Sequence, residues 1–496
     1  MNDFGEFLEK TKRANVIPVI EILPADLLTP LSVYLKLSRN HSQSFLLESV
    51  EGGESLARYS FIGAAPEMTI SGTDKQITIR NSQGETIRQI SIINYLREHF
   101  ATNKVLEDAD IPSFIGGAIG SLGFSCSGWF EPTVKNSVDS DDDEASFMLF
   151  RSLVAFDHAK QVIKVVSLVF TEESEAKADQ LEQLYKDALT ENLRIKAILE
   201  NEPVVLPKAN LQFENGEVTS NWKQADFESA VLEVKEMISA GECYQVVLSQ
   251  CFTKPTSASP VSIYRAMRSL NPSPYMFLLQ TGDCSVIGAS PEMLVKCSGD
   301  KLQYRPIAGT RPRGKTPDED AQLSIEMRAD EKEVAEHLML VDLGRNDLGR
   351  VAEFGSIKVR DLMSVEKYSH VQHLVSYLSG NLREGCDRFD ALASCFPAGT
   401  VSGAPKVRAI EIIQKLEPTS RGIYAGAVGY FDYAGNMDTC IAIRTLVLEN
   451  GVAKIQAGAG IVADSVPELE YQETINKAKM LLTAIEIAEF TTSGEA

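Results

Sequence analysis

Residues 336–350 read Glu-His-Leu-Met-Leu-Val-Asp-Leu-Gly-Arg-Asn-Asp-Leu-Gly-Arg, and this stretch says most about the fold. With Glu333 just before it, two carboxylates and His337 fall at i, i+3 and i+4, which predicts that they share one face of a helix. A neighbouring apolar stripe, typical of a helix half-buried against a core, consists of Val334, Leu338 and Val341. Paired acids on such a helix most often line a solvated face, so the stretch alone predicts a helix and not a site.

A second acidic helix is predicted near the end of the chain, from about Pro467 to Phe490. Within it Glu470, Glu473 and Lys477 fall at i, i+3 and i+7, so they share one face. Two helices that each present carboxylates, with histidine and lysine nearby, can hold a hard divalent cation such as Mg²⁺ between them. The two helices therefore predict a candidate metal site.

The bulk composition describes an ordinary soluble globular protein. Of the 496 residues, 44% are hydrophobic and 24% are charged, and this length predicts two intimately joined domains. Prolines and a Glu-Asn-Gly-Glu turn mark a connection between them. We therefore expect an N-terminal part at residues 1–205, a linker at 206–220 and a second domain at 221–490.

Several classes of protein are excluded by the same properties. No apolar stretch approaches the length of a membrane span, and the N-terminus does not read as a signal peptide. Eight cysteines without a C-x-x-C pair indicate the reduced thiols of a cytoplasmic protein, not a zinc site or a disulfide framework. A net charge of −21 argues against nucleic acid or an anionic membrane as a partner, so an anionic substrate must be held by local cations.

Short strand-like runs separated by turns fill the first part of the chain. These runs are Ser44–Val50, Met68–Ser71, Gln76–Arg80, Leu149–Phe156 and Val162–Phe170. Glu172–Glu200 has the charge pattern of a surface helix, and the acidic run Asp139–Glu144 reads as a solvated loop. Strands and helices alternate irregularly, so the fold class is α/β of the α+β type, with mixed sheets and packed helices.

The second half of the chain gathers groups that bind small anions. The run Ala398–Lys406 fails the spacing of a nucleotide-binding loop, but its Gly-Thr-x-Ser-Gly can present N–H groups and hydroxyls to a carboxylate. Gln456–Val462 offers a second such nest at the end of a strand. Arg444, in the strand-like run Cys440–Val447, can grip a carboxylate bidentately. Each also reads as a tight turn or a surface arginine, and it is their density that indicates a site for a small dianion.

Histidine supplies a candidate general base. His370 and His373 stand together in Tyr-Ser-His-Val-Gln-His-Leu, and in a strand residues i and i+3 point to opposite faces, so at most one enters a given site. Such a pair is more often structural than catalytic. Beside the acids described above, however, a base with a near-neutral pKa is reasonable.

Together these motifs resemble the chorismate-utilising enzymes and, among them, the large synthase subunits of anthranilate synthases. The resemblance covers most of the chain and is strongest from about Asp226 to Leu482. The runs that carry it are Gly241–Gln250, Ala289–Glu292, Arg305–Gly314, Glu336–Arg350, His370–Leu374, Pro397–Lys406, Gly458–Val462 and Pro467–Lys477. It implies mixed, largely antiparallel β-sheets sandwiched and flanked by helices, with chorismate bound in the C-terminal domain.

Two positions distinguish among members of this family. Isochorismate and salicylate synthases have a lysine at the position of Gln245, where it activates water. A glutamine cannot act as that base and suits ammonia, which needs no activation. Aminodeoxychorismate synthases have a lysine that attacks the ring at the position of Ala308. The resemblance therefore implies a lyase that converts chorismate and ammonia into anthranilate and pyruvate, the first step of tryptophan biosynthesis.

The resemblance also implies a metal and a set of substrate ligands. Glu336 and Glu473 would hold Mg²⁺, with Glu333 and Glu470 as outer or water-mediated partners. The residues implied in binding the carboxylates of chorismate are Thr310, Tyr424, Arg444, Gly458, Gly460 and Lys477.

The catalytic residues implied are Glu292, His373, Gln245 and Thr310. Glu292 would be the general acid at the departing 4-hydroxyl. His373 would remove the proton whose loss expels pyruvate and makes the ring aromatic. We prefer His373 to His370 because the family motif ends in His-Leu, and a His373 packed among apolar residues is the alternative.

The N-terminal part implies feedback inhibition by tryptophan. Phe45–Ser49 resembles the family's Leu-Leu-Glu-Ser element, and Asn271–Met276 resembles its Asn-Pro-Ser-Pro-Tyr-Met partner. Without the resemblance they would read as a strand end and a turn. Glu48 would take the ammonium group of tryptophan. The other residues implied in binding the inhibitor are Ser49, Arg58, Pro274, Tyr275 and Met276.

A glutaminase nucleophile motif is missing from the sequence. We therefore expect ammonia to come from solution or from a separate glutamine amidotransferase subunit, in a heterodimer or heterotetramer. Two alternatives stay open: an aminodeoxychorismate synthase, which Ala308 disfavours, and a catalytically silent scaffold that senses tryptophan. The presence of both Glu292 and His373 disfavours the scaffold, because a binding protein needs no acid–base pair.

Overall fold

Strand β2 (Gln43–Glu48) shows how the sheets of this protein are covered. In the computed structural model, Phe45 contacts Phe150 with ring centroids 4.7 Å apart, while Leu46 enters a second hydrophobic core. Successive residues of a strand point to opposite faces, so a continuous apolar run predicts a strand covered on both sides. The structure describes residues 3–49, 58–106, 110–134, 144–174, 178–210, 212–368 and 371–493.

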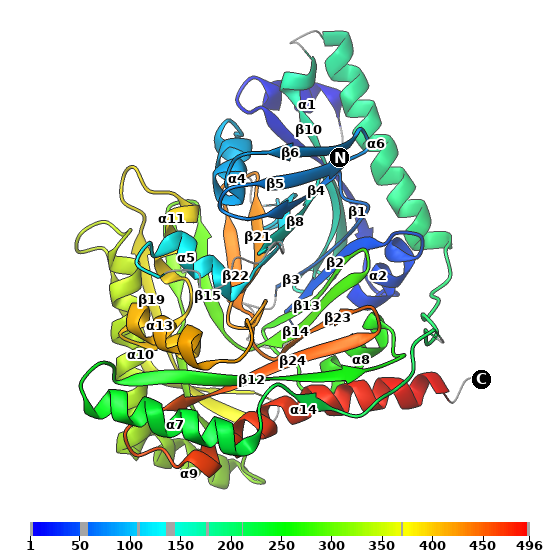
Figure 1. Ribbon diagram of the computed structural model, residues 1–496. Helices are drawn as coiled ribbons and strands as arrows, with labels where there is room; N and C mark the ends of the chain where they lie inside the picture. The colour runs from blue at the N-terminus through cyan, green and yellow to red at the C-terminus, as the bar shows by residue number, and fades with distance from the viewer. Residues whose placement is uncertain are drawn as a thin grey trace.

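The strands pair antiparallel into two large sheets (Figure 1). In spatial order, the first sheet contains β1 (Val16–Pro24), β10 (Val162–Phe170), β9 (Ser152–Asp157), β3 (Tyr59–Ala64), β2, β13 (Tyr275–Thr281), β14 (Cys284–Ser290), β23 (Thr445–Glu449), β24 (Val452–Ile461), β12 (Gln245–Pro255) and β11 (Thr219–Ser220), with β20 (Gly403–Ala404) beside β12. The second contains β17 (Ile307–Pro312), β19 (Val371–Asn381), β16 (Lys301–Tyr304), β15 (Met293–Ser298), β22 (Met437–Ile441), β21 (Ala427–Asp432), β7 (Gly117–Leu122), β8 (Ala145–Phe150), β4 (Met68–Gly72), β5 (Ile77–Asn81) and β6 (Gly84–Arg88), with β18 (Lys358–Lys367) beside β19.

One hydrophobic core lies between the two sheets and a second lies outside the first sheet. The inner core joins Phe45 and Phe61 of the first sheet to Phe150 and Tyr430 of the second. The outer core is closed by helices α2 (Pro30–Ser38), α6 (Ala178–Asn201), α8 (Pro260–Leu270) and α14 (Pro467–Ser493), and Tyr34, Tyr264 and Leu481 are among its members. Helices α10 (Glu331–Gly349) and α11 (Arg388–Cys395) contact the second sheet on strands β15, β17 and β19. The expected arrangement of antiparallel sheets sandwiched and flanked by helices is therefore confirmed.

The helices agree with the sequence prediction where their periodicity is long. Both acidic helices are confirmed, as α10 (Glu331–Gly349) and α14 (Pro467–Ser493), and the charged run after β10 forms α6 (Ala178–Asn201). The other helices are α1 (Phe4–Thr11), α2 (Pro30–Ser38), α4 (Ile92–Ala101), α5 (Ser127–Phe130), α7 (Gln224–Ser239), α8 (Pro260–Leu270), α9 (Pro317–Ala329), α11 (Arg388–Cys395), α12 (Gly399–Ser402) and α13 (Lys406–Leu416), with short 3₁₀ turns at Phe124–Cys126 and Thr171–Ser174.

The N-terminal and C-terminal parts of the sequence share both sheets. In the first sheet β2 pairs with β13, placing Leu46 opposite Leu278, and in the second β7 pairs with β21, placing Leu122 opposite Ala427. The boundary at residues 206–220 therefore separates two parts of the sequence but not two sheets. The assignment of regulation to one part and catalysis to the other stays a prediction.

One predicted strand is wrong. The run Leu149–Phe156 is divided between β8, which ends at Phe150, and β9, which begins at Ser152, and these strands belong to different sheets. Arg151 lies at the break and pairs with Glu67 and Glu173. The apolar residues of the run do not show that the chain passes from one sheet to the other. The only indication in the sequence was the polar residues inside the run. Most of the predicted acidic loop, 139–143, lies outside the described residues.

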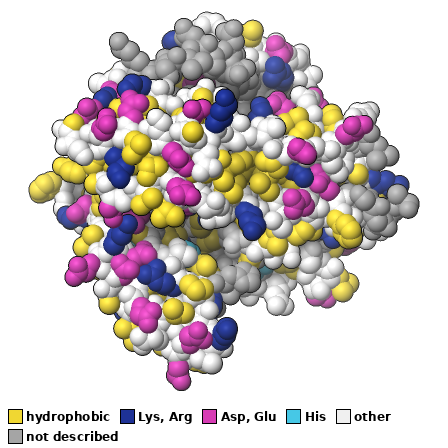
Figure 2. Space-filling view, turned by 60° about the horizontal axis from the view of Figure 1, so that its bottom comes forward, with side chains coloured by type: hydrophobic (Ala, Val, Ile, Leu, Met, Phe, Trp, Pro, Cys, Tyr) yellow, Lys and Arg dark blue, Asp and Glu magenta, His cyan; other side chains and the backbone are white. Residues whose placement is uncertain are grey.

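The surface bears no large area of a single charge on the face shown in Figure 2, where acidic and basic side chains are interspersed. Among the described helices, none combines the length and the apolar character needed to cross a bilayer.

Candidate active site

A cavity of about 850 Å³ opens where the ends of β12, β17, β19 and β24 meet helices α10 and α14. It is lined by all the residues that the resemblance assigns to catalysis, to substrate binding and to direct contact with the metal, but not by Glu333, which was implied as an outer partner of the metal. The assigned residues that line it are Gln245, Glu292, Thr310, Glu336, His373, Tyr424, Arg444, Gly458, Gly460, Glu473 and Lys477. The fold therefore brings together residues that lie in separated parts of the sequence.

Three glutamates from the two acidic helices face this cavity: Glu336 on α10, and Glu470 and Glu473 on α14. Burial raises the pKa of Glu336, with further contributions from the neighbouring charges of Glu333 and Glu473. Burial also raises the pKa of Glu470, and Glu473 adds to the rise. Like charges that repel one another in a partly dry site favour an added cation. Lys477 supplies one, with its Nζ 2.7 Å from Glu473 Oε1.

The carboxylates of the cavity fit Mg²⁺ better than they fit a metal whose ligands all come from the protein. Within the described residues, no group of three or more histidine, cysteine or acidic side chains is arranged to hold a metal. Mg²⁺ usually takes only one or two carboxylates and completes its coordination with water and substrate oxygens. Glu336 and Glu473 have the chemistry for that role.

Glu333 and His337 do not join Glu336 in the cavity, so the predicted shared face is wrong. Glu333 pairs with Arg311 at 2.8 Å, and the buried His337 forms a hydrogen bond of 2.6 Å between its Nε2 and Ser376 Oγ on β19. Adjacent residues of a helix diverge by about 100°, so His337 turns to the sheet while Glu336 faces the cavity. For the same reason Leu338, expected in the apolar stripe, is 41% exposed.

His373 is held on β19 by a bulge in the neighbouring strand. The pairing of β17 with β19 shifts register at Gly309, whose φ of +63° is a conformation that suits glycine. The bulge brings the Gly309 carbonyl oxygen to 2.9 Å and Thr310 Oγ1 to 3.1 Å from His373 Nδ1. A carbonyl only accepts hydrogen bonds, so Nδ1 carries the proton and Nε2 keeps its lone pair. Burial lowers the pKa of His373, which leaves it neutral near pH 7 and able to act as a base.

Glu292 follows β14 and has the opposite character. It is 7% exposed, and burial raises the pKa of its carboxyl to about 8, against smaller opposing effects of Thr400 and Arg305. At neutral pH the group is therefore mainly protonated and able to give up a proton. A neutral base and a protonated acid in one cavity are the pair that acid–base chemistry at neutral pH needs.

Arg444 lines the cavity, but the prediction that it lies within a strand is wrong. Strand β22 ends at Ile441 and β23 begins at Thr445, in different sheets, and Arg444 lies at the turn between them with a φ of +50°. Left-handed backbone is unfavourable for a residue with a side chain, so the surrounding structure must hold Arg444 in this conformation. The turn points the guanidinium toward α14, where its Nη1 donates to the Lys477 carbonyl oxygen at 3.4 Å.

The glycines of β24, which were predicted to form an anion-binding nest, lie in close contact with neighbouring side chains. A methyl group at Gly458 would lie 2.7 Å from Tyr424 Oη, and one at Gly460 would lie 2.6 Å from Gln245 Nε2. Only glycine allows these side chains to reach the strand. Lys477 Nζ donates to the Gly458 carbonyl oxygen at 2.9 Å, so the same strand positions a cation.

Four further polar residues line the cavity that were not singled out from the sequence: Thr400, Gln456, Lys332 and Asp464. Thr400 and Gln456 belong to the two runs expected to bind a carboxylate, so the sequence indicated the runs but not these individual residues. Lys332 and Asp464 pair at 3.5 Å between α10 and the loop after β24, and both are highly exposed. A pair of exposed charges in distant segments leaves no sequence signal.

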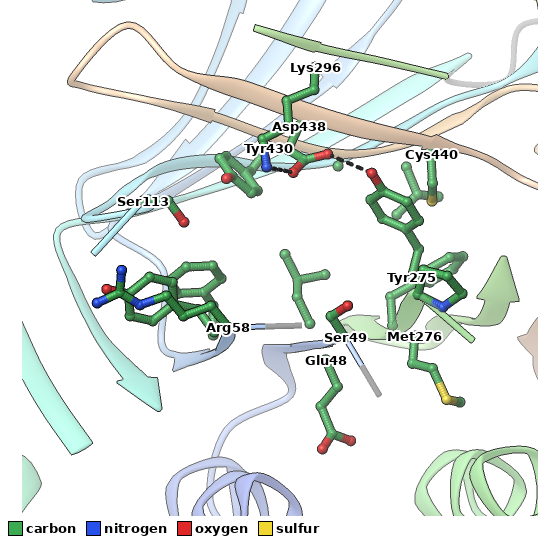
Figure 3. Close-up of a pocket in the computed structure, with 17 residues that line it drawn as sticks. Glu48, Ser49, Arg58, Ser113, Tyr275, Met276, Lys296, Tyr430, Asp438 and Cys440 are labelled. Carbon is green, nitrogen blue, oxygen red and sulfur yellow. Dashed lines mark hydrogen bonds and ion pairs between the residues drawn. The ribbon is translucent and has the colours of Figure 1, made fainter. Parts of the chain in front are cut away.

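A second, smaller cavity of about 110 Å³ is lined by all six residues expected to bind an inhibitor: Glu48, Ser49, Arg58, Pro274, Tyr275 and Met276 (Figure 3). Lys296, Tyr430, Asp438 and Cys440 complete its polar lining together with Ser113, and none of them was predicted. Except for Ser113, they come from β15, β21 and β22 of the second sheet, whereas Glu48 and Met276 belong to the first sheet, so this cavity lies between the sheets.

The polar groups of this second cavity differ in how far they are engaged. Glu48 points away from Asp438 in Figure 3, and its carboxylate accepts hydrogen bonds from Tyr264 Oη at 2.5 Å and Arg268 Nε at 3.1 Å. Within the described residues, Ser49 Oγ and Arg58 Nε are buried and make no hydrogen bond. A buried polar atom without a partner is costly, and a ligand can satisfy it. His370 lies outside the described residues.

Comparison with known proteins accounts for this arrangement. The family model described as chorismate binding enzyme matches residues 26–483 of the chain. The chain belongs to the chorismate-binding enzyme family. The fold is therefore that of a chorismate-binding enzyme.

Relatives of this chorismate-binding enzyme cover nearly its whole length. It is 43% identical over 486 residues to the anthranilate synthase component 1 of Acetivibrio thermocellus, covering 96% of this chain and 97% of the relative. It is 42% identical over 485 residues to that of Pseudomonas aeruginosa, covering 96% of each. Among solved structures, anthranilate synthase component I from Streptococcus pneumoniae TIGR4 matches with a TM-score of 0.73 and 36% identity, covering 92% of this chain and 99% of that one.

Proposed function

We propose that this chain is the large synthase subunit of an anthranilate synthase, a carbon–oxygen lyase that converts chorismate and ammonia into anthranilate and pyruvate. One observation carries the proposal: Gln245 and Ala308, the two positions that separate reactions within the family, line the same cavity as Glu292 and His373. Neither position offers an amine that could activate water or attack the ring. The cavity therefore suits a nucleophile that enters already neutral and reactive.

In the first step, ammonia adds to the ring carbon beside the one that bears the carboxylate. The C4–O bond breaks, and Glu292, protonated at neutral pH, gives its proton to the departing hydroxyl, which leaves as water. The new ammonium group gives one proton to the Glu292 carboxylate and becomes an amine, which leaves Glu292 protonated again. Burial of Glu292 is what makes it an acid at this pH, because the charged form is poorly solvated.

In the second step, His373 Nε2 removes the remaining proton from the carbon that now bears the amine. The bond from the ring to the enolpyruvyl oxygen breaks, the leaving group takes up a proton as pyruvate, and the ring becomes aromatic. The Gly309 carbonyl fixes the required tautomer of His373, and Thr310 helps to orient the imidazole ring of His373. Thr310 also serves as a candidate ligand of a substrate carboxylate.

Chorismate carries two carboxylates, and this chain's net charge does not favour their entry. Arg444, Lys477 and the backbone N–H groups of Gly458 and Gly460 would bind them, with Tyr424 against the ring. Glu336 and Glu473 would hold Mg²⁺. When bound, the metal supplies positive charge that neutralises the ring carboxylate and fixes its orientation.

The second cavity supports a proposed feedback site for tryptophan. Its apolar lining of Pro274 and Met276 suits an indole ring. Ser49 Oγ and Arg58 Nε, which make no hydrogen bond within the described residues, suit the polar end of an amino acid. With Glu48 already engaged, we propose that the ammonium group is bound only after that carboxylate turns from Arg268. The enzyme would then act first in tryptophan biosynthesis, in the cytoplasm, beside a glutamine amidotransferase subunit that supplies ammonia.

The test is to incubate the purified chain with chorismate, Mg²⁺ and ammonium salt, and to identify the product by chromatography. We expect anthranilate that depends on ammonium and that tryptophan suppresses. Aminodeoxychorismate, isochorismate or salicylate would overturn the argument from Gln245 and Ala308. Absence of turnover, with tryptophan still bound, would favour a silent scaffold.

A further inference from the structure

Arg421, in the loop between α13 and β21, lies behind the wall of the catalytic cavity. Its side chain is 1% exposed. The guanidinium donates from Nη1 to the Val401 carbonyl oxygen at 2.8 Å and from Nη2 to the Val247 carbonyl oxygen at 2.7 Å. Val401 on α12 and Val247 on β12 both line the cavity. One planar side chain therefore joins two elements that carry Thr400 and Gln245.

The rest of the guanidinium reaches a third wall through a buried carboxylate. Arg421 Nε donates to Glu417 Oε2 at 2.8 Å and Nη2 donates to Oε1 at 2.6 Å. Glu417 Oε1 accepts from the backbone N–H and the hydroxyl of Ser249, both at 2.8 Å, and Gln456 Nε2 donates to Ser249 Oγ at 2.8 Å. Gln456 lines the cavity on β24, the strand that carries Gly458 and Gly460.

The same guanidinium also lies against an aromatic ring of the site. Its central carbon is 5.5 Å from the ring centroid of Tyr424 and 4.6 Å from that of Phe124. Stacking of this kind favours one orientation of the ring. Tyr424 lines the cavity, so the guanidinium contacts a fourth part of the wall directly.

We propose that Arg421 is a positioning residue that fixes the walls of the catalytic cavity relative to one another. The proposal rests on the proposed function for its effect on turnover. Arg421 touches no reacting atom. It acts through the carbonyl groups of Val247 and Val401, through the Glu417–Ser249–Gln456 chain and through the ring of Tyr424. A lysine keeps the charge opposite Glu417 but cannot present a planar fork of donors to several acceptors at once.

Any buried arginine contributes to folding, so the test needs a second arginine of the same kind. Arg388 is 7% exposed, donates to the carbonyl oxygens of Asp432 at 2.6 Å and Asn436 at 2.8 Å, and lies 4.7 Å from the ring centroid of Phe100. It does not line the catalytic cavity. Arg388→Lys is therefore a matched control for Arg421→Lys.

The experiment compares the two variants in melting temperature, in kcat and KM for chorismate, and in hydrogen–deuterium exchange. We expect both to lose stability. Only Arg421→Lys should lose about 10- to 100-fold in kcat/KM, because misplaced walls disturb the reacting geometry. Only this variant should exchange faster in the segments around residues 245–250, 398–403 and 422–426.

Equal losses of activity in the two variants, in proportion to stability, would overturn the proposal, as would unchanged exchange in those segments. If Arg421→Lys does not fold, Glu417→Gln tests one branch of the network. Faster exchange is then expected around Ser249 and Gln456 but not around Val401. Unchanged exchange around Ser249 and Gln456 would contradict the proposal. Failure of the wild-type chain to form anthranilate would refute the proposed function, whereas the exchange data still decide the role of Arg421.

Discussion

The larger and the smaller cavity are lined by different strands, and they hold charge in opposite ways. The larger one, of about 850 Å³, gathers Glu336, Glu470 and Glu473, and of these Glu473 pairs with Lys477 at 2.7 Å. In the smaller one, of about 110 Å³, Asp438 is bound on two sides, by Lys296 at 2.8 Å and Tyr275 Oη at 3.1 Å (Figure 3). The larger cavity therefore keeps carboxylates that can take a cation, whereas Asp438 of the smaller cavity is already paired with one.

The distance along the chain between the two sites is short. Glu292 of the catalytic cavity directly precedes β15, which carries Lys296 of the small cavity, and β22 carries Asp438 and leads through Ile441 toward Arg444. Ile441 N–H donates to the Glu292 carbonyl oxygen at 3.1 Å, and its carbonyl oxygen accepts from Ser290 Oγ at 2.7 Å. A change of packing in one cavity therefore has a short mechanical connection to the other.

Removing the candidate base should give the largest effect on one cavity alone. His373→Asn should lower kcat by about 10²- to 10⁴-fold, the usual range for general acid–base catalysis. Tryptophan affinity, measured by calorimetry, should stay unchanged because His373 lines only the larger cavity. A variant that keeps more than a tenth of wild-type kcat would exclude His373 as the base.

The second prediction separates two glutamates one helical turn apart. Glu336→Gln should lower Mg²⁺-dependent kcat/KM by at least about 100-fold, because a metal at a substrate carboxylate supplies several kcal/mol. Glu333→Gln is the control, since Glu333 pairs with Arg311 and does not line the cavity. Titration with Mg²⁺ would show the difference as a shift in the half-activating concentration. Equal effects of the two substitutions would argue against the assignment of Glu336.

The third prediction is a pH profile limited on both sides. Glu292 acts when protonated, so kcat/KM per free ammonia should fall above its pKa of about 8. His373 acts when neutral, and its pKa is lowered from 6.5, so the acidic limb should lie below pH 6.5. Glu292→Gln should remove the alkaline limb together with most of the activity. An alkaline limb that persists in this variant would assign it to another group.

The smallest effect is expected in the regulatory cavity. Ser49→Ala removes a buried hydroxyl that lacks a partner among the described residues, and it should raise the inhibition constant for tryptophan by about 3- to 10-fold, the contribution of one neutral hydrogen bond. Ser44→Ala, on the strand that Ser49 follows, is the control, because Ser44 bonds to Tyr34 Oη at 3.0 Å and does not line this cavity. Its effect should fall on stability alone. An unchanged inhibition constant for Ser49→Ala would leave Ser49 without a polar contact to tryptophan.

From the sequence, the helices and the residues that line the cavity could be predicted better than the orientation and contacts of single side chains. The two acidic helices were correct because their period is long and regular. The orientation of His337 and the break at Arg444 were not, because both depend on which sheet the chain meets next. Glu48 was expected to be free for a ligand, and its bonds to Tyr264 and Arg268 come from a helix far along the chain. Pairings such as β7 with β21 likewise leave no local pattern.

The sharing of both sheets by the two parts of the sequence limits how this protein can be altered. Removing the N-terminal part would strip β2 from β13 and β7 from β21, leaving long unpaired edges and removing the inner-core residues that this part contributes. On the proposed regulation, an enzyme that ignores tryptophan can therefore arise by changing single side chains but not by shortening the gene. Natural or selected resistance to feedback should appear as missense changes around β2, β13 and β22, and never as a truncation.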